Sequence, residues 1–197
     1  MRKLFILLTV LAMAALTGCS SKLMDPMLDP GIESYAGQST ITFYRPSAFG
    51  GAVQAPLGVE IRTDDLALVG ISSTKTKIRH VVEPGDHVFV VGGESGSLLK
   101  ASILPNKHYY VKVSPRFGWA KARFALMAVT PEELMNTEIQ ELSKCVLVVP
   151  NADADKWFLE NKRSMLDKLR VAKEKFGKDE NKAEHTLLPE HGVNMLY

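Results

Sequence analysis

The chain has 197 residues, of which 46% are hydrophobic and 23% charged, a composition typical of globular rather than disordered proteins. Its 24 basic and 22 acidic residues give a formal net charge of +2, and two of the basic residues, Arg2 and Lys3, stand at the N-terminus. A chain this close to neutrality lacks the net basic charge with which nucleic-acid binders displace counterions from phosphates, so we expect no nucleic-acid partner.

Residues 1–18 have the layout of an export signal. Arg2 and Lys3 precede an apolar run from Leu4 to Leu16, which is shorter than the roughly 20 apolar residues that a helix needs to cross about 30 Å of hydrocarbon. A basic start, a short apolar run and small residues behind it are typical of a signal peptide. The segment is therefore predicted to direct export and then to be removed.

The signal ends in the residues LTGC, of which Gly18 and Cys19 are the last two. This stretch resembles the lipobox of bacterial lipoproteins. The resemblance implies cleavage between Gly18 and Cys19, a diacylglyceryl group on the thiol of Cys19, and a fatty acyl chain such as palmitate on the freed amine. Apart from this covalent lipid, no cofactor is expected. The alternative is an ordinary signal peptide in which the cysteine carries nothing.

The residue after the cysteine, Ser20, bears on the destination. By resemblance to the lipoproteins of Gram-negative bacteria, a serine rather than an aspartate here implies the outer membrane, facing the periplasm. Acyl chains contribute about 0.8 kcal/mol per buried methylene, so two or three of them hold a protein on a bilayer permanently. We therefore expect a lipid-anchored cell-envelope protein, at the periplasmic face of the outer membrane if the host is Gram-negative.

Residues 19–38 are expected to form a flexible tether. The stretch SSKLMDPMLDPGIESYAGQ holds two prolines and two glycines and has no sustained periodicity. At up to about 3.3 Å per residue, it could reach roughly 60 Å when fully extended. The folded part is therefore predicted to stand clear of the bilayer.

Short runs rich in β-branched and aromatic residues follow from Ser39 to Val129, separated by turn residues. This spacing predicts about eight strands with no helix between them. At Glu83 to Asp86, a proline and a glycine fit the two central positions of a type II turn. The expected strands comprise residues 39–45, 57–63, 66–71, 76–82, 87–91, 97–104, 108–114 and 121–129.

The period changes at Thr130. A threonine followed by Pro131 and, three residues on, by Glu133 forms a capping box, which predicts a helix of roughly twelve residues. The apolar run CVLVVP, ending at Pro150, is then a buried strand that could complete the sheet. Cys145 in this run is expected to be a buried, unreactive thiol.

A long amphipathic helix is predicted over residues 151–178, capped by Asn151 or Asp153 and ended by Gly177. One narrow stripe of this helix is apolar and must pack on something; it consists of Phe158, Met165, Leu169, Ala172 and Phe176, with breaks at Asn161 and Lys162. The polar residues 179–197 are expected to form a mobile tail.

These elements predict a mainly β protein with a C-terminal α part: a small antiparallel β-sandwich of about eight or nine short strands over residues 39–150, a short helix, and the long helix. The stretches TITFYRPSAFGGAVQAPLGVEI, VEPGDHVFVV and LPNKHYYVKVSPRFG are similar to a domain family of unknown function found in bacterial lipoproteins. Asp64 and Asp65 stand where members often have a glycine turn. The resemblance implies a β-sandwich on a lipid anchor and no established activity; it covers about residues 39–133 and rests on Tyr44, Arg45, Pro84, Gly85, His87, Tyr109 and Tyr110.

The residues that could carry catalysis do not form a recognisable pattern. The histidines lack the spacing of a zinc site, and the loop GGESGS joins two expected strands and lacks the second glycine of a nucleophile elbow. His87 is expected to bond a turn carbonyl. We therefore predict no metal site, no catalytic residue and no enzymatic activity.

Two segments are candidate interaction surfaces. Aromatic and arginine side chains form binding hot spots when they are exposed, and the loop PRFGW presents Arg116, Phe117 and Trp119. The apolar stripe of the long helix presents Phe158, Met165 and Leu169.

The functional hypothesis is a non-catalytic binding or assembly module that docks on an envelope protein. One alternative is an enzyme acting on cell-wall or lipid material, with His87 or His108 as its base. The other is a structural lipoprotein that self-associates through the long helix. The oligomeric state stays open.

Overall fold

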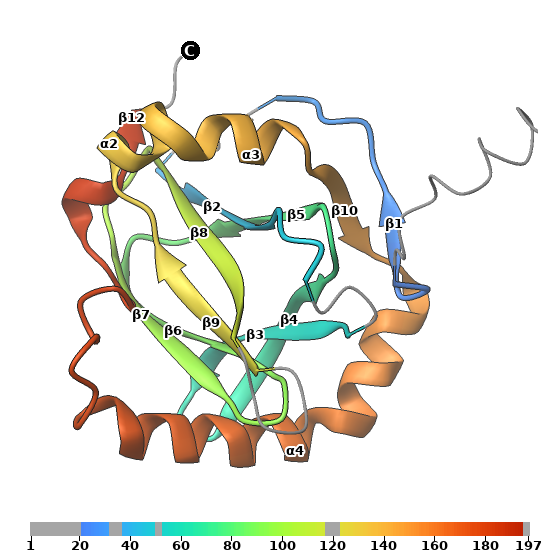
Figure 1. Ribbon diagram of the computed structural model, residues 1–197. Coiled ribbons are helices and arrows are strands. Elements are labelled where there is room, and N and C mark those ends of the chain that lie inside the picture. The colour runs from blue at the N-terminus through green and yellow to red at the C-terminus, as the bar shows by residue number, and fades with distance from the viewer. Residues whose placement is uncertain (1–20, 32–36, 50–52, 117–122, 195–197) are drawn as a thin grey trace, which may run out of the picture.

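The structure is a computed structural model that describes residues 21–31, 37–49, 53–116 and 123–194 (Figure 1). The predicted signal peptide, Cys19, Phe117 and Trp119 lie outside the described residues. The strands are β1 (Met24–Pro26), β2 (Ser39–Arg45), β3 (Ala55–Arg62), β4 (Asp65–Ser72), β5 (Thr76–Val82), β6 (Gly85–Val91), β7 (Ser97–Ile103), β8 (Lys107–Arg116), β9 (Arg123–Ala128), β10 (Val146–Pro150), β11 (Thr186–Leu187) and β12 (Val193–Asn194). The helical segments are α2 (Pro131–Glu133), η1 (Leu134–Glu138), α3 (Ile139–Ser143), α4 (Ala152–Phe176) and η2 (Pro189–His191).

The strands form two sheets, so the protein is mainly β with a C-terminal helix. One sheet has the order β1-β10-β5-β2-β8-β12, with β9 also paired to β8, and the other has the order β11-β7-β6-β3-β4. Apolar side chains from both sheets form one core, in which the rings of Phe43 and Phe89 lie 5.2 Å apart. Figure 1 shows α4 along one side of the two sheets and the helix from α2 to α3 on the opposite side.

The sequence predicts an antiparallel sandwich, but both sheets of the structure are mixed. Strand β2 runs parallel to β8, and β10 runs parallel to β5. The chain enters β2 and β8 from the same end, where the Ser39 hydroxyl donates to the carbonyl of Leu104 (2.5 Å) and accepts from the amide of Lys107 (2.9 Å). Because both strands start at this shared point, they must run in the same direction.

The turns and strand boundaries follow the local sequence closely. Strands β2 and β5 have the predicted bounds, and Gly85, the first residue of β6 after the turn, has a φ of +124°. Asp64 and Asn106, in two other predicted turns, also have positive φ, a conformation that aspartate and asparagine tolerate better than most residues.

The helix predicted after Thr130 is confirmed, with a wider turn in its middle. The Thr130 hydroxyl accepts from the amide of Glu133 (3.2 Å), and the Glu133 carboxylate accepts from the amide of Thr130 (2.9 Å), so the capping box is present. In η1 the amide of Ile139 donates to the carbonyl of Leu134, five residues back. The widened turn lies above the outer face of β2, where Leu134 packs against Tyr44, Val129 and Cys145.

The long helix is also confirmed, and α4 packs on the chain's own five-stranded sheet. The side chain of Asn151 caps it by accepting from the amide of Asp153 (3.2 Å). Its apolar stripe lies against Leu66 and Val90, and the stripe residues Phe158, Met165 and Leu169 are buried. These three side chains therefore present no free surface, which corrects their assignment as a docking face.

The predicted tether is wrong for its described part. Strand β1 pairs antiparallel with β10, and Ser21 is buried. The aspartate that follows, Asp29, forms ion pairs with Lys77 (2.7 Å) and Arg79 (3.0 Å). A strand of three residues carries no periodicity of its own, so its pairing with β10, more than 120 residues later in the chain, could not be read from the local sequence.

The predicted mobile tail is likewise wrong for residues 179–194. Strand β11 pairs with β7 and β12 pairs with β8, and Leu187 is completely buried in the core between the sheets. Backbone pairing at these two sheet positions fixes a segment that is polar in composition. Within the described ranges, no helix is long and apolar enough to cross a membrane.

Candidate functional site

The two histidines considered as catalytic bases are both engaged in the fold. His87 donates from Nε2 to the carbonyl of Glu83 (2.8 Å), as predicted for the turn. His108 is 1% exposed, shares a hydrogen bond with the Thr42 hydroxyl (Nε2 to Oγ1, 2.8 Å) and stacks on the ring of Tyr110. Burial lowers the pKa of His108 to about 3. His108 is thus a neutral side chain without access to solvent.

A shallow hollow of about 390 Å³ brings His87 near Asp86 and Ser102. The Ser102 hydroxyl donates to the Asp86 carboxylate (2.6 Å), so these two groups satisfy each other. Among the described residues, no hydrogen bond joins His87 to either of them. The arrangement does not form a relay from a base to a nucleophile.

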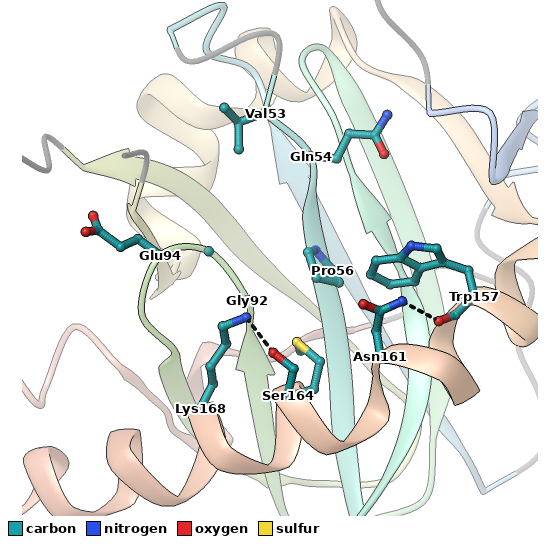
Figure 2. Close-up of a pocket in the computed structure, with 11 residues that line it drawn as sticks. Val53, Gln54, Pro56, Gly92, Glu94, Trp157, Asn161, Ser164 and Lys168 are labelled. Atoms are coloured by element: carbon teal, nitrogen blue, oxygen red, sulfur yellow. Dashed lines mark hydrogen bonds between the residues drawn. The ribbon is translucent and has the colours of Figure 1, made fainter. Parts of the chain in front are cut away.

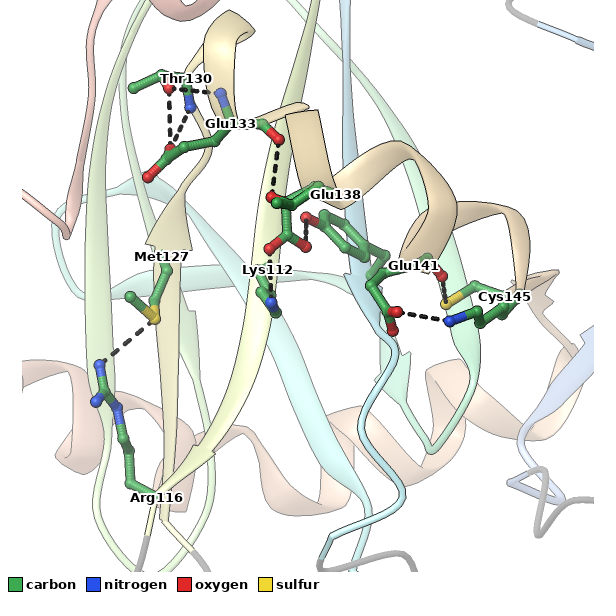
Figure 3. Close-up of polar contacts among 11 residues, drawn as sticks. Lys112, Arg116, Met127, Thr130, Glu133, Glu138, Glu141 and Cys145 are labelled. Atoms are coloured by element: carbon green, nitrogen blue, oxygen red, sulfur yellow. Dashed lines mark hydrogen bonds and ion pairs between the residues drawn. The ribbon is translucent and has the colours of Figure 1, made fainter. Parts of the chain in front are cut away.

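The aromatic and arginine residues singled out in the sequence divide between core and surface. Tyr44, Arg45 and Tyr109 are completely buried. Arg116 is exposed, and its guanidinium lies 3.6 Å from the Glu184 carboxylate. The same guanidinium lies 3.4 Å from the sulfur of Met127 (Figure 3). Its expected neighbours in an interaction loop, Phe117 and Trp119, are outside the described residues, so this surface stays a prediction.

A partly buried polar network explains the tyrosine on β2. The Tyr44 hydroxyl donates to one oxygen of Glu138 (2.7 Å), and the other oxygen accepts from Lys112 (2.7 Å) (Figure 3). Burial, and then the bond to the Glu138 carboxylate, raise the pKa of Tyr44. This network ties the helix after Thr130 to the seven-stranded sheet and is a structural feature.

A cleft of about 690 Å³ lies between α4 and the five-stranded sheet (Figure 2). We call it the α4 cleft. One wall is the middle of α4, from Trp157 to Lys168, and the other comprises the start of β3 and the loop after β6. It is lined by Val53, Gln54, Pro56, Gly92, Gly93, Glu94, Trp157, Asn161, Ser164, Met165 and Lys168.

Close packing fixes the floor of the α4 cleft. The amide of Gly92 donates to the carbonyl of Pro56 (2.8 Å). A Cβ atom added to Gly92 would lie 2.6 Å from the sulfur of Met165 and 2.9 Å from Cγ of Pro56. The glycine therefore lets the helix approach the strand, and the two walls hold a fixed separation at this point.

The polar side chains of the helix wall keep unused hydrogen-bonding capacity. Asn161 donates to the carbonyl of Trp157 (2.8 Å), and Lys168 donates to the hydroxyl of Ser164 (3.2 Å). These bonds leave the amide oxygen of Asn161 and two ammonium hydrogens of Lys168 for a ligand. Among the described residues, no carboxylate lies within ion-pair distance of Lys168.

The opposite wall adds a carboxylate and an amide. Glu94 lies 3.5 Å from the guanidinium of Arg123, which offsets its charge. Gln54 accepts a hydrogen bond from the hydroxyl of Ser21 (2.9 Å), the first described residue of the chain. In Figure 2, Trp157 and Asn161 lie on one side of the strand that bears Pro56, and Glu94, on the loop after β6, lies on the other side.

The α4 cleft offers both apolar and polar contacts to a ligand. Trp157 and Pro56 supply apolar contact, and the amides and Lys168 supply directional polar contact, as is usual for small-molecule sites. Across the described ranges, no group of three histidine, cysteine, aspartate or glutamate side chains could hold a metal ion.

One sequence pattern of the long helix indicates this site. Asn161 interrupts the apolar stripe of the long helix, and Trp157, Asn161, Ser164 and Lys168 follow one another at spacings of four, three and four residues. Such spacings place the four side chains on one face of a helix. A polar break beside a buried stripe marks the rim of the packed region, where a cleft can begin.

Comparisons with known proteins give no further guide: no family model, no curated protein and no solved structure matches the chain.

Proposed function

We propose that this chain is a lipid-anchored protein of the cell envelope whose body, a β-sandwich with a C-terminal helix, acts as a non-catalytic binding module through the α4 cleft. The anchor is Cys19, carried by the resemblance of LTGC to a lipobox. In a Gram-negative host the module stands at the periplasmic face of the outer membrane. The likeness to a domain family of lipoproteins belongs to the same proposal.

The observation that carries the binding role is the amphipathic lining of the α4 cleft. Trp157 and Pro56 offer apolar surface next to Asn161 and Lys168, whose side chains, among the described residues, form hydrogen bonds within α4 only. A rigid wall with unused donors and acceptors is suited to hold a ligand in one orientation. This feature distinguishes the α4 cleft from the hollow at His87, where the polar groups bond each other.

The geometry favours binding over the two alternatives. Acid–base chemistry requires a base within reach of substrate, whereas His108 is buried and His87 is bonded to a turn carbonyl. Self-association through the apolar stripe of α4 would require that stripe to be free, but Phe158, Met165 and Leu169 pack on the sheet of the same chain.

Site-specific photo-crosslinking tests the binding role. A photoreactive amino acid is placed at Ser164 in the α4 cleft and, as a control, at Glu174, an exposed position of the same helix outside the cleft lining. We expect irradiation of whole cells to give a discrete adduct from position 164 only. The adduct should weaken severalfold when Lys168 is replaced by Met, and its mass gives the class of ligand. Equal labelling at both positions, or none, would count against the α4 cleft as a binding site.

A further inference from the structure

The fold begins almost immediately after the proposed anchor. Ser21 is two residues beyond Cys19 and is 3% exposed. Its hydroxyl donates to the side chain of Gln54 (2.9 Å), and its carbonyl accepts from the amide of Met24 (3.1 Å). The described chain is therefore held by hydrogen bonds to the folded body from its first residue, Ser21.

The next residues are fastened to the sheet and to the long helix. Asn151, the N-cap of α4, donates from its side-chain amide to the carbonyl of Lys22 (2.9 Å). Its backbone amide donates to the carbonyl of Leu23 (3.1 Å). Strand β1 then pairs with the last residues of β10, which lead into α4. Residues 22–26 are therefore part of the folded body and do not form a flexible linker.

The length of the connection limits how far the body can stand from the lipid. Two residues span at most about 7 Å, against the roughly 60 Å expected for a free tether over residues 19–38. This span of about 7 Å is far less than the width of the folded body, because α4 alone, with 25 residues, is about 37 Å long. A lipidated Cys19 therefore holds the Ser21 end of the body at the level of the lipid head groups.

The segment that follows β1 carries side chains suited to such a surface. Met27 is 46% exposed and Leu28 is 93% exposed, the highest value among the large apolar side chains of the described chain. The amide of Met27 bonds the carbonyl of Leu147 (2.9 Å), so this segment continues along the edge of the seven-stranded sheet. Exposed apolar side chains at a fixed backbone, within ten residues of a lipid anchor, fit insertion among head groups.

We propose that the folded body rests directly on the bilayer, with Leu28 and the β1 edge among the lipid head groups and the Gln54 end of the α4 cleft beside them. The partner of this surface is the lipid bilayer itself. This inference rests on the proposed function, because it requires the lipid on Cys19. It replaces the picture of a module held away from the membrane, and it places the bilayer next to the cleft.

Fluorescent labelling at single cysteines tests this orientation. The lipidated protein is reconstituted in vesicles of phosphatidylethanolamine and phosphatidylglycerol, with an environment-sensitive fluorophore at Leu28→Cys or at Met135→Cys. Met135 is a 70% exposed apolar residue of the helix after Thr130 and serves as the matched control. The native thiols do not interfere: Cys19 is alkylated, and Cys145 is buried with its pKa raised to about 11. We expect severalfold brighter, blue-shifted emission at position 28 and none of this change at position 135.

A Gly/Ser insertion of about twenty residues between Ser20 and Ser21 gives the second comparison. It lengthens the average reach of the link to roughly 25 Å, so the signal at position 28 should fall severalfold while the protein stays on the vesicles. Equal emission at positions 28 and 135, or a signal unchanged by the insertion, would overturn the orientation alone. An intact mass showing an unmodified Cys19 would overturn the anchor and the orientation together.

Discussion

His108 and His80 are kept neutral inside the fold. His108 lies on β8 between Thr42 and Tyr110, and burial, with a smaller contribution from Arg79, lowers its pKa to about 3. His80 lies on β5 beside the ring of Phe89, and burial, with a smaller effect of His87, lowers its pKa to about 4. In the unfolded chain both titrate near 6.5, so the unfolded state takes up protons first as the pH falls.

The folded state should therefore lose stability as the pH falls from about 6.5 toward 4. Each of the two histidines contributes a slope of up to about 1.4 kcal/mol per pH unit in this window, because between the two pKa values the unfolded state binds a proton that the folded state does not. His108→Asn cannot take up a proton and should flatten the slope by about one histidine's share. Urea unfolding at pH 7.5 and pH 5.0 measures this; equal losses in wild type and variant would contradict the assignment of His108.

The contacts of individual side chains were only partly predictable from the sequence. The bond of His87 to the turn was predicted, because it involves a carbonyl four residues away. The neighbours of His108 and Tyr44 could not be predicted, since Tyr44 reaches Glu138 across 94 residues of chain. Local sequence determines the geometry of a turn, but it does not specify which distant side chain meets a buried hydroxyl.

At the scale of elements, the sequence predicted those that are long enough to show a period. Strands such as β2 and β5, the capped helix after Thr130 and the helix α4 all carry seven or more patterned residues or a cap. The strands β1, β11 and β12 have only two or three residues. They are strands because a distant partner pairs with them, and no local pattern distinguishes them from loop.

The contact between α4 and the loop after β6 depends on Gly96. A Cβ atom at this position would lie 2.6 Å from the carbonyl oxygen of Lys168, which is backbone and cannot rotate away. We expect Gly96→Ala to destabilise the fold by about 1–3 kcal/mol, because the helix must shift from the sheet. Gly177→Ala is the matched control, since a Cβ there meets nothing within 4 Å. If both variants unfold at the same urea concentration, the close approach at Gly96 does not contribute to the free energy of unfolding.

At the scale of the whole molecule, the two ends of the described chain hold the fold together. The carbonyls of Glu184 and His185 accept from Ala128 on β9 (2.8 Å) and Lys100 on β7 (3.0 Å), so one segment joins the two sheets. His185 adds a bond from Nδ1 to the carbonyl of Leu126 (2.7 Å). The expectation of a mobile tail followed from polar composition, which does not record backbone pairing.

The α4 cleft also forms only when distant segments of the chain come together in the fold. Its walls come from three segments, around Gln54, around Gly92 and from Trp157 to Lys168. Each segment alone looks like ordinary loop or helix, and the sequence supplied only the polar break at Asn161. The proposed anchor, in contrast, rests on a local motif, which is read from the sequence without tertiary structure.

The central claim is that Cys19 attaches this binding module to the envelope, and mass spectrometry of the mature N-terminus with fractionation of cells tests it most directly. We predict a first residue Cys19 carrying a diacylglyceryl group and an acyl chain, with the wild-type protein in the membrane fraction. Cys19→Ala should not be lipidated and should leave that fraction. A wild-type protein that is unmodified at Cys19 and fractionates with the soluble periplasmic proteins would contradict the account.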